Sequence, residues 1–140
     1  MTINDIEKEI VEEFDFFGDD WESKYEHLIE LGKSLPLIDD SLKTDDRIIQ
    51  GCQSRVWLNS ELKNGELIFT ADSDAIITKG MVALMIRVLS HQKPEDIVKA
   101  DLSFINKIGL TEHLSPTRAN GLLSMINQMK KEAIKYSYKS

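Results

Sequence analysis

The sequence RVWLNSELKNGELIFT, residues 55–70, sets the architecture of this chain. Residues 55–62 and 66–70 both read as strands, and Lys63-Asn64-Gly65 lies between them. An Asn-Gly pair between two such runs is a strong signal for a β-hairpin, because both residues tolerate the backbone that a tight hairpin turn needs. We therefore predict two antiparallel strands, forming a small antiparallel sheet.

The only cysteine comes just before the first strand, in residues 51–54 (GCQS). A glycine adopts backbone conformations that are closed to other residues, so we expect Cys52 on a tight loop. Loops on a rigid scaffold often carry reactive groups, although a lone cysteine is also commonly a small buried hydrophobe. The reactive form is the thiolate, which nearby positive charge favours, and Arg55 and Arg118 are the candidate cations.

Helices are expected on both sides of the hairpin. Apolar side chains at helical spacing predict helices at residues 2–14, from 19 or 20 to 32, at 75–89 and from 116 onward, with short turns at 94–99 and 103–107. The helix at 75–89 is apolar around nearly its whole circumference, so it should be buried, and Gly80 predicts close packing against the sheet. The fold class is therefore α+β, as one domain over residues 1–140.

Composition narrows the possible classes of protein. Hydrophobic residues make up 41% and charged residues 29% of the 140, which is typical of globular proteins. Residues 1–5 (MTIND) show no secretory signal, no apolar run is long enough to span a bilayer, and one cysteine forms no internal disulfide. We therefore expect a cytoplasmic protein that binds neither membranes nor, given its net charge of −7, nucleic acid.

The charge is unevenly distributed along the chain. Residues 1–46 hold 15 acidic and 4 basic residues, a net of −11, whereas residues 47–140 hold 9 acidic and 13 basic, a net of +4. The two sum to −7. The acidic part is interpreted either as a solvated helix pair or as a dedicated docking surface.

Charged residues lie at the starts of two of the predicted helices. Residues 72–74 (DSD) are expected to end the second strand and to cap the helix that follows. Arg118 lies in the first turn of the last helix, where a cation opposes the helix dipole. Either an anionic partner or an ordinary salt bridge to Glu112 would explain Arg118.

Other site chemistries have little support in the sequence. One cysteine and the scattered His27, His91 and His113 do not form a zinc or iron-sulfur ligand set. No glycine-rich phosphate loop is present, and no Ser-His-Asp arrangement can be picked out. The remaining candidate is Cys52, which must react with another molecule because the chain has no second cysteine to resolve an internal disulfide.

The sequence contains three separated motifs, at residues 51–57 (GCQSRVW), at residues 72–75 (DSDA) with Lys79-Gly80, and at residues 113–118 (HLSPTR) followed by Gly121. Together with Leu35-Pro36 and Gly109-Leu110, these motifs resemble the SufE family of sulfur-acceptor proteins. The resemblance covers nearly the whole chain. It implies a fold similar to that of SufE and of the IscU-like scaffold proteins of iron-sulfur assembly.

The same resemblance implies a function for Cys52. A SufS-like or CsdA-like cysteine desulfurase, which uses its own pyridoxal phosphate, would hold sulfur as a persulfide. Cys52 would take that sulfur, stimulate the desulfurase and pass the sulfur to a SufB-like assembly complex, so the chain would be a carrier without cofactor or metal, not an enzyme. The implied supporting and docking residues are Gly51, Gln53, Ser54, Trp57, Asp74 and Arg118, with Trp57 as a wall around the sulfur.

Two alternatives remain open. The chain is a scaffold that assembles a cluster itself, or a one-cysteine thiol redox protein whose cysteine oxidises to a sulfenic acid. The sequence does not distinguish the main assembly pathway from a parallel desulfurase system.

Overall fold

The computed structural model describes the backbone of residues 1–139, and it confirms the α+β class. Strands β1 (Val56–Lys63) and β2 (Glu66–Ser73) form an antiparallel two-stranded sheet. Asn64 and Gly65 have φ angles of 54° and 82°, as the predicted turn requires. Strand β2 runs three residues further than expected, because residues 71–73 continue to pair with β1.

The expected helices are present. The helices are α1 (Ile3–Asp15), α2 (Trp21–Lys33), α3 (Ile76–Leu89), α4 (Pro94–Lys99), α5 (Phe104–Lys107), α6 (Leu110–His113) and α7 (Pro116–Lys139), with two 3₁₀ turns, η1 (Asp40–Leu42) and η2 (Asp45–Arg47). Helix α6 was not expected, and the segment between α2 and β1 contains η1 and η2. Thr2 and Asp5 form a reciprocal capping box that begins α1.

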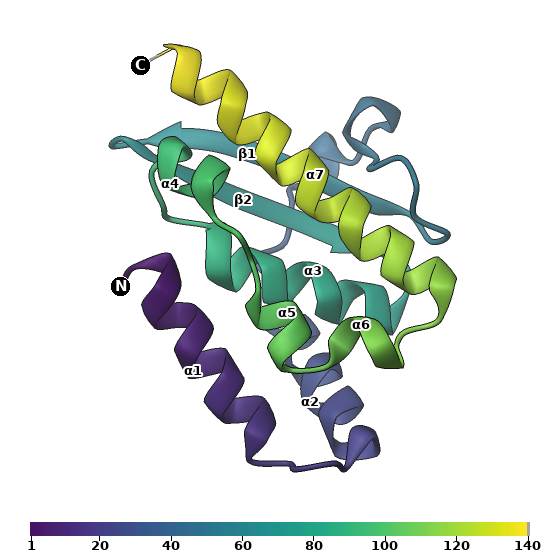
Figure 1. The fold of residues 1–140 in the computed structure, drawn as a ribbon. Coiled ribbons are helices and arrows are strands. Elements are labelled where there is room, and N and C mark those ends of the chain that lie inside the picture. The colour runs from purple at the N-terminus through teal and green to yellow at the C-terminus, as the bar shows by residue number, and fades with distance from the viewer. Residues whose placement is uncertain (140) are drawn as a thin grey trace.

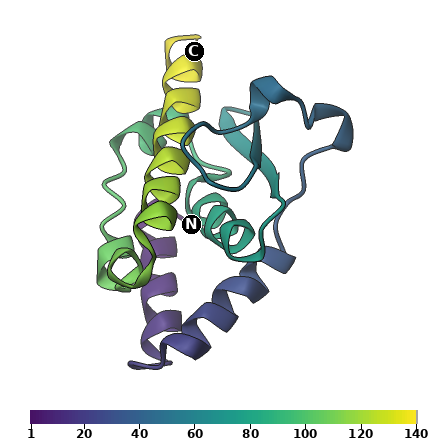
Figure 2. The ribbon, with the colours of Figure 1, turned by 90° about the vertical axis from the view of Figure 1, so that its right-hand side faces the viewer.

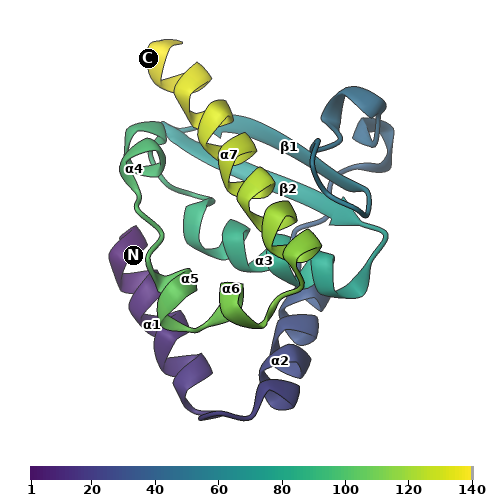
Figure 3. The same ribbon diagram turned by 45° about the vertical axis from the view of Figure 1, so that its right-hand side comes forward.

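The elements pack around α3. Helix α7 runs diagonally across the hairpin, α3 lies below it, and α1 and α2 form a V on the far side of α3 (Figures 1 and 3). Ten of the 14 residues of α3 are buried. The inward face of the hairpin contributes Val56, Leu58, Leu67, Phe69 and Ala71 to the same hydrophobic cluster. The prediction of a buried central helix is therefore confirmed.

The close packing expected at Gly80 involves a different partner. A Cβ at Gly80 would lie 2.3 Å from the carbonyl oxygen of Leu28 on α2, and a Cβ at Gly32 would lie 3.0 Å from the backbone nitrogen of Gly80. The two glycines thus allow the backbones of α2 and α3 to cross in near contact. The prediction that Gly80 packs against the sheet was wrong, because a helix apolar on all sides contacts several elements and its sequence does not say which one lies closest.

The segment between α2 and β1 runs past the end of the hairpin that lies away from its turn (Figure 2). Leu37 forms a parallel bridge with Ala71, and Ile48 forms an antiparallel bridge with Trp57. The backbone N–H of Ile49 donates to the carbonyl of Val56 at 2.8 Å. Residues 47–50 therefore form only an isolated bridge with β1, and from there the chain enters the loop that holds Cys52.

Candidate functional site

Cys52 lies on a short loop between η2 and β1, against the first turns of α7. Gly51 has a φ of +95°, and a Cβ there would lie 2.3 Å from Oγ of Ser124. The thiol of Cys52 donates to the carbonyl oxygen of Gly121 at 3.5 Å, and a Cβ at Gly121 would lie 3.6 Å from Sγ. Glycines on both sides of the contact therefore bring the cysteine loop and α7 close together.

The loop is fastened to α3 and β2 by polar contacts. Oγ of Ser54 donates to Oγ1 of Thr78 at 2.9 Å. The backbone N–H of Arg55 donates to Oδ1 of Asp74 at 3.1 Å, and the N–H of Asp74 donates to the Arg55 carbonyl at 3.3 Å. The position before α3 is Ala75, which makes no side-chain cap. The expectation that residues 72–74 cap α3 was therefore wrong, because the carboxylate of Asp74 bonds to the loop instead.

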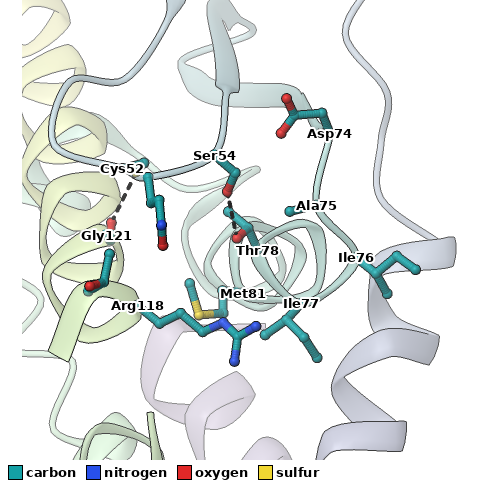
Figure 4. Close-up of a pocket in the computed structure, with 12 residues that line it drawn as sticks. Cys52, Ser54, Asp74, Ala75, Ile76, Ile77, Thr78, Met81, Arg118 and Gly121 are labelled. Atoms are coloured by element: carbon teal, nitrogen blue, oxygen red, sulfur yellow. Dashed lines mark hydrogen bonds between the residues drawn. The ribbon is translucent and has the colours of Figure 1, made fainter. Parts of the chain in front are cut away.

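These segments surround a pocket of about 560 Å³ (Figure 4). Its lining comes from the loop, from α3 with the residues just before it, and from α7: Cys52, Gln53, Ser54, Asp74, Ala75, Ile76, Ile77, Thr78, Met81, Thr117, Arg118 and Gly121. Five of the expected site residues thus meet in one pocket, and Gly51 adjoins it. The α3 contributors were not anticipated, because their apolar pattern identified them only as core.

The electrostatics around the thiol differ from expectation. Burial raises the pKa of the Cys52 thiol above its ordinary value. Arg55 is exposed on the loop and Arg118 is exposed at the pocket, and neither is a cause of that shift. Burial alone gives the direction of this shift, so the expected stabilisation of the thiolate by these cations is not found in this conformation. Among the residues that the structure describes, Arg118 forms no salt bridge, so the predicted pair with Glu112 is absent.

Trp57 does not wall the pocket. Successive side chains of a strand point to opposite faces, and Val56 and Leu58 take the buried inner face of β1. Trp57 lies on the outer face, where Nζ of Lys43 is 5.5 Å from its ring and Asp72 is its cross-strand neighbour. The wall expected from Trp57 is provided instead by Ile76, Ile77 and Met81 of α3.

The described residues offer neither a metal-binding cluster nor a membrane-spanning helix. Within this part of the chain, no group of three or more His, Cys, Asp or Glu side chains is placed to hold a metal ion. Along residues 1–139, no helix combines the length and apolar character needed to cross a bilayer.

The fold and the site define a small α+β protein with one thiol held in a pocket between a loop, α3 and α7. A family model described as the SufE Fe-S metabolism associated domain matches residues 8–133, so the chain belongs to the SufE family, which is associated with iron-sulfur metabolism. An uncharacterized SufE-like protein of Rhizobium meliloti is 42% identical over 130 residues, covering 89% of this chain and 92% of that protein.

Further relatives agree with this assignment. An uncharacterized SufE-like protein of Rhizobium etli is 38% identical over 130 residues, covering 89% of this chain and 87% of that protein. A solution structure of a hypothetical protein from Thermus thermophilus superposes with a TM-score of 0.76 at 19% identity, covering 93% of this chain and 94% of that one. That likeness supports the α+β fold.

Proposed function

We propose that Cys52 accepts the terminal sulfur of a persulfide held by a pyridoxal-phosphate cysteine desulfurase and carries it towards iron-sulfur assembly. The observation that supports this function is the placement of the single thiol. Cys52 is half-buried, it faces a pocket large enough to hold an added sulfur atom, and α3 supplies apolar walls. Such a pocket limits the access of water and oxidants to a bound persulfide.

The transfer is a thiol exchange without net oxidation. The Cys52 thiolate attacks the terminal sulfur of the desulfurase persulfide, the partner's S–S bond breaks, and a new S–S bond forms on Cys52. The desulfurase cysteine leaves as a thiolate and takes up the proton that Cys52 lost. No external oxidant or reductant is needed for this step.

The environment of Cys52 makes the free protein a poor nucleophile. Because burial raises its pKa, the thiol stays largely protonated near neutral pH. The partner must therefore help to remove the proton or to expose the sulfur. Arg118 stands at the same pocket without a salt bridge among the described residues, and its cation is placed to attract an anionic persulfide.

The proposal includes the setting in which the chain acts. Its donor is a SufS-like or CsdA-like desulfurase that brings the pyridoxal phosphate, and its acceptor is a SufB-like assembly complex. The chain itself is a carrier and activator in the cytoplasm, not an enzyme, and it needs no cofactor of its own. Gly51, Gln53, Ser54 and Asp74 position the loop.

The deciding experiment is intact-mass spectrometry after incubation with a cysteine desulfurase, pyridoxal phosphate and free cysteine. We expect a gain of one sulfur atom, reversible by reductant and mapped to Cys52, together with faster desulfurase turnover. Cys52→Ser should lose both effects, and stimulation that survives this substitution contradicts the carrier function. A stable cluster spectrum after addition of iron and sulfide would favour the scaffold alternative. Turnover of peroxide with an external thiol would favour the redox alternative.

A further inference from the structure

A second pocket lies at the opposite end of α3 from Cys52. It has a volume of about 340 Å³, and its apolar lining comes from α2, the chain between α2 and η1, β2 and α3: Leu31, Pro36, Ile68, Phe69, Ala83 and Ile86. The Cys52 pocket is lined by residues of α3 between positions 76 and 81. This pocket is lined by residues of α3 between positions 83 and 87 and by the two residues that follow the helix. The two pockets share no lining residue.

The ionisable residues that line this second pocket are Arg87 and His91, and the charge of Arg87 is balanced by carboxylates of α1. Arg87 lines it and contacts Glu9 at 2.8 Å and also Glu13, so these three groups together carry a net charge of −1. The guanidinium is held by α1 through these contacts, which raise its pKa, and its charge is already balanced. An anionic ligand would therefore find no uncompensated cation at this position.

Helix α2 carries a row of exposed carboxylates on its surface. Glu22, Glu26 and Glu30 recur every four residues and are all exposed, so they form one row along the helix. Lys33 pairs with Glu30 at 2.8 Å, but both side chains are 66% exposed, and such a pair exchanges readily with another cation. Leu31, the residue of α2 that begins the apolar lining, follows Glu30 in the sequence and lies about a quarter of a turn further around the helix.

A third hollow lies along the same helix. It has a volume of about 380 Å³ and is lined by Phe17, His27 and Ile29 together with Glu26 and Glu30. Apolar depressions thus alternate with carboxylates along α2. A partner that matches this pattern presents aliphatic side chains beside cations, and the four-residue spacing of the glutamates matches the repeat of another helix.

We propose that the outer face of α2 is a docking surface for a basic amphipathic helix of a partner protein. An aliphatic side chain of that helix enters the pocket between α2, β2 and α3, and its Lys or Arg residues lie against the row of Glu22, Glu26 and Glu30. This gives the strongly acidic residues 1–46 a binding role. The docking surface does not depend on sulfur transfer, and it allows the partner to hold the chain while Cys52 stays accessible.

The test is a titration of the whole chain, labelled at its methyl groups for NMR, with a synthetic amphipathic helix of leucine and lysine. We expect saturable shifts at Leu31, Ile68 and Ile86 and none at Ile76 and Ile77 of the Cys52 pocket. A peptide with glutamate in place of lysine, and one with serine in place of leucine, should not bind. Equal binding of either control peptide, shifts confined to the Cys52 pocket, or no binding at all overturns the proposal.

Charge-matched variants separate docking from a general attraction to an acidic protein. Glu26→Lys with Glu30→Lys should weaken binding of the leucine-lysine peptide about tenfold at low salt. Glu61→Lys with Glu95→Lys changes the net charge equally on exposed positions of β1 and α4, and it should weaken binding about twofold or less. An equal loss in both double variants overturns the proposal.

Matched apolar variants test the pocket itself. Ile68→Ser removes part of the apolar lining and should reduce binding of the leucine-lysine peptide. Leu123→Ser, at a 55% exposed position of α7, makes the same kind of change on another element and should leave binding unaltered. The reverse result would place the docking surface on α7 and overturn the proposal.

Discussion

Two regions of the molecule are held in place in different ways. One is the crossing of α2 and α3, and the other is the loop that holds Cys52. At the crossing, Gly32 and Gly80 bring two backbones into near contact, and the side chains of Leu28 and Leu84 beside them are buried. At the loop, the attachments are four polar contacts and the glycines that make room for them. The comparison indicates that stability is concentrated at the crossing and that the loop can change conformation at low cost.

The largest effect is expected at the crossing. Gly80→Ala places a methyl group 2.3 Å from a backbone carbonyl, which cannot move aside as a flexible side chain can. We expect the free energy of unfolding to fall by about 2–3 kcal/mol, even though alanine favours helices. Urea denaturation checks this value. Unchanged stability would mean that the two helices separate without cost, and the contrast with the loop would then be lost.

A smaller effect is expected at the ionic contacts between α1 and α3. The Arg87 guanidinium hydrogen-bonds to Glu13 and holds the pKa of that carboxyl below its ordinary value of 4.5. A lowered folded-state pKa stabilises the protein above the unfolded-state pKa, and this contribution disappears as the pH falls through the folded-state pKa. Arg87→Met should therefore cost about 1–2 kcal/mol at pH 7.

The pH dependence of this cost is the control. Urea titrations of wild type and Arg87→Met should differ at pH 7 and converge at an acidic pH below the lowered folded-state pKa of Glu13, where that carboxyl is protonated in both. A difference that is the same at both pH values would show that the loss comes from the packing of the aliphatic part of Arg87.

At the loop, a glycine substitution should have the opposite sign. A Cβ at Gly121 meets Sγ of Cys52 at 3.6 Å, an ordinary contact, so Gly121→Ala should stabilise α7 by about 0.5–1 kcal/mol. The added methyl group also covers the thiol, so alkylation by iodoacetamide should slow. Asn120→Ala, at the exposed neighbouring position, is the control for both measurements. A destabilised Gly121→Ala protein would show that the loop side is as tightly packed as the helix crossing.

The smallest stability effect is expected at Arg118. Its side chain is exposed and opposes the dipole of α7, so Arg118→Ala should change the free energy of unfolding by less than about 0.5 kcal/mol. If the proposed function is correct, sulfur transfer from the desulfurase should weaken nonetheless. Normal transfer together with a large loss of thermal stability would instead assign Arg118 a structural role.

The sequence predicted the elements of the fold better than their contacts. The Asn64-Gly65 turn and the apolar helix 75–89 are local signals, and the structure confirms them. Gly80 and Asp74 were assigned to the wrong partners, because each contacts a residue distant in the sequence. Helix α6 was missed because a four-residue helix has no periodicity to detect.

The candidate site shows the same limit. Cys52 and its neighbours could be identified from one short motif, and Asp74 and Arg118 from two others. That these three segments meet at one pocket could not be derived from spacing, and neither could the contribution of Thr78 and Met81. Trp57 was misplaced because the strand pattern leaves open which of its two faces turns to the core.

The hydrogen bond between Cys52 and Gly121 joins residues that are 69 positions apart. During synthesis, Cys52 therefore leaves the ribosome well before the helix that shelters it. At roughly 5–20 residues per second, the interval lasts several seconds, longer than most elementary folding steps. Throughout that time the nascent chain presents an unprotected thiol to cellular oxidants and electrophiles. The thiol is thus sheltered only after α7 has emerged and folded.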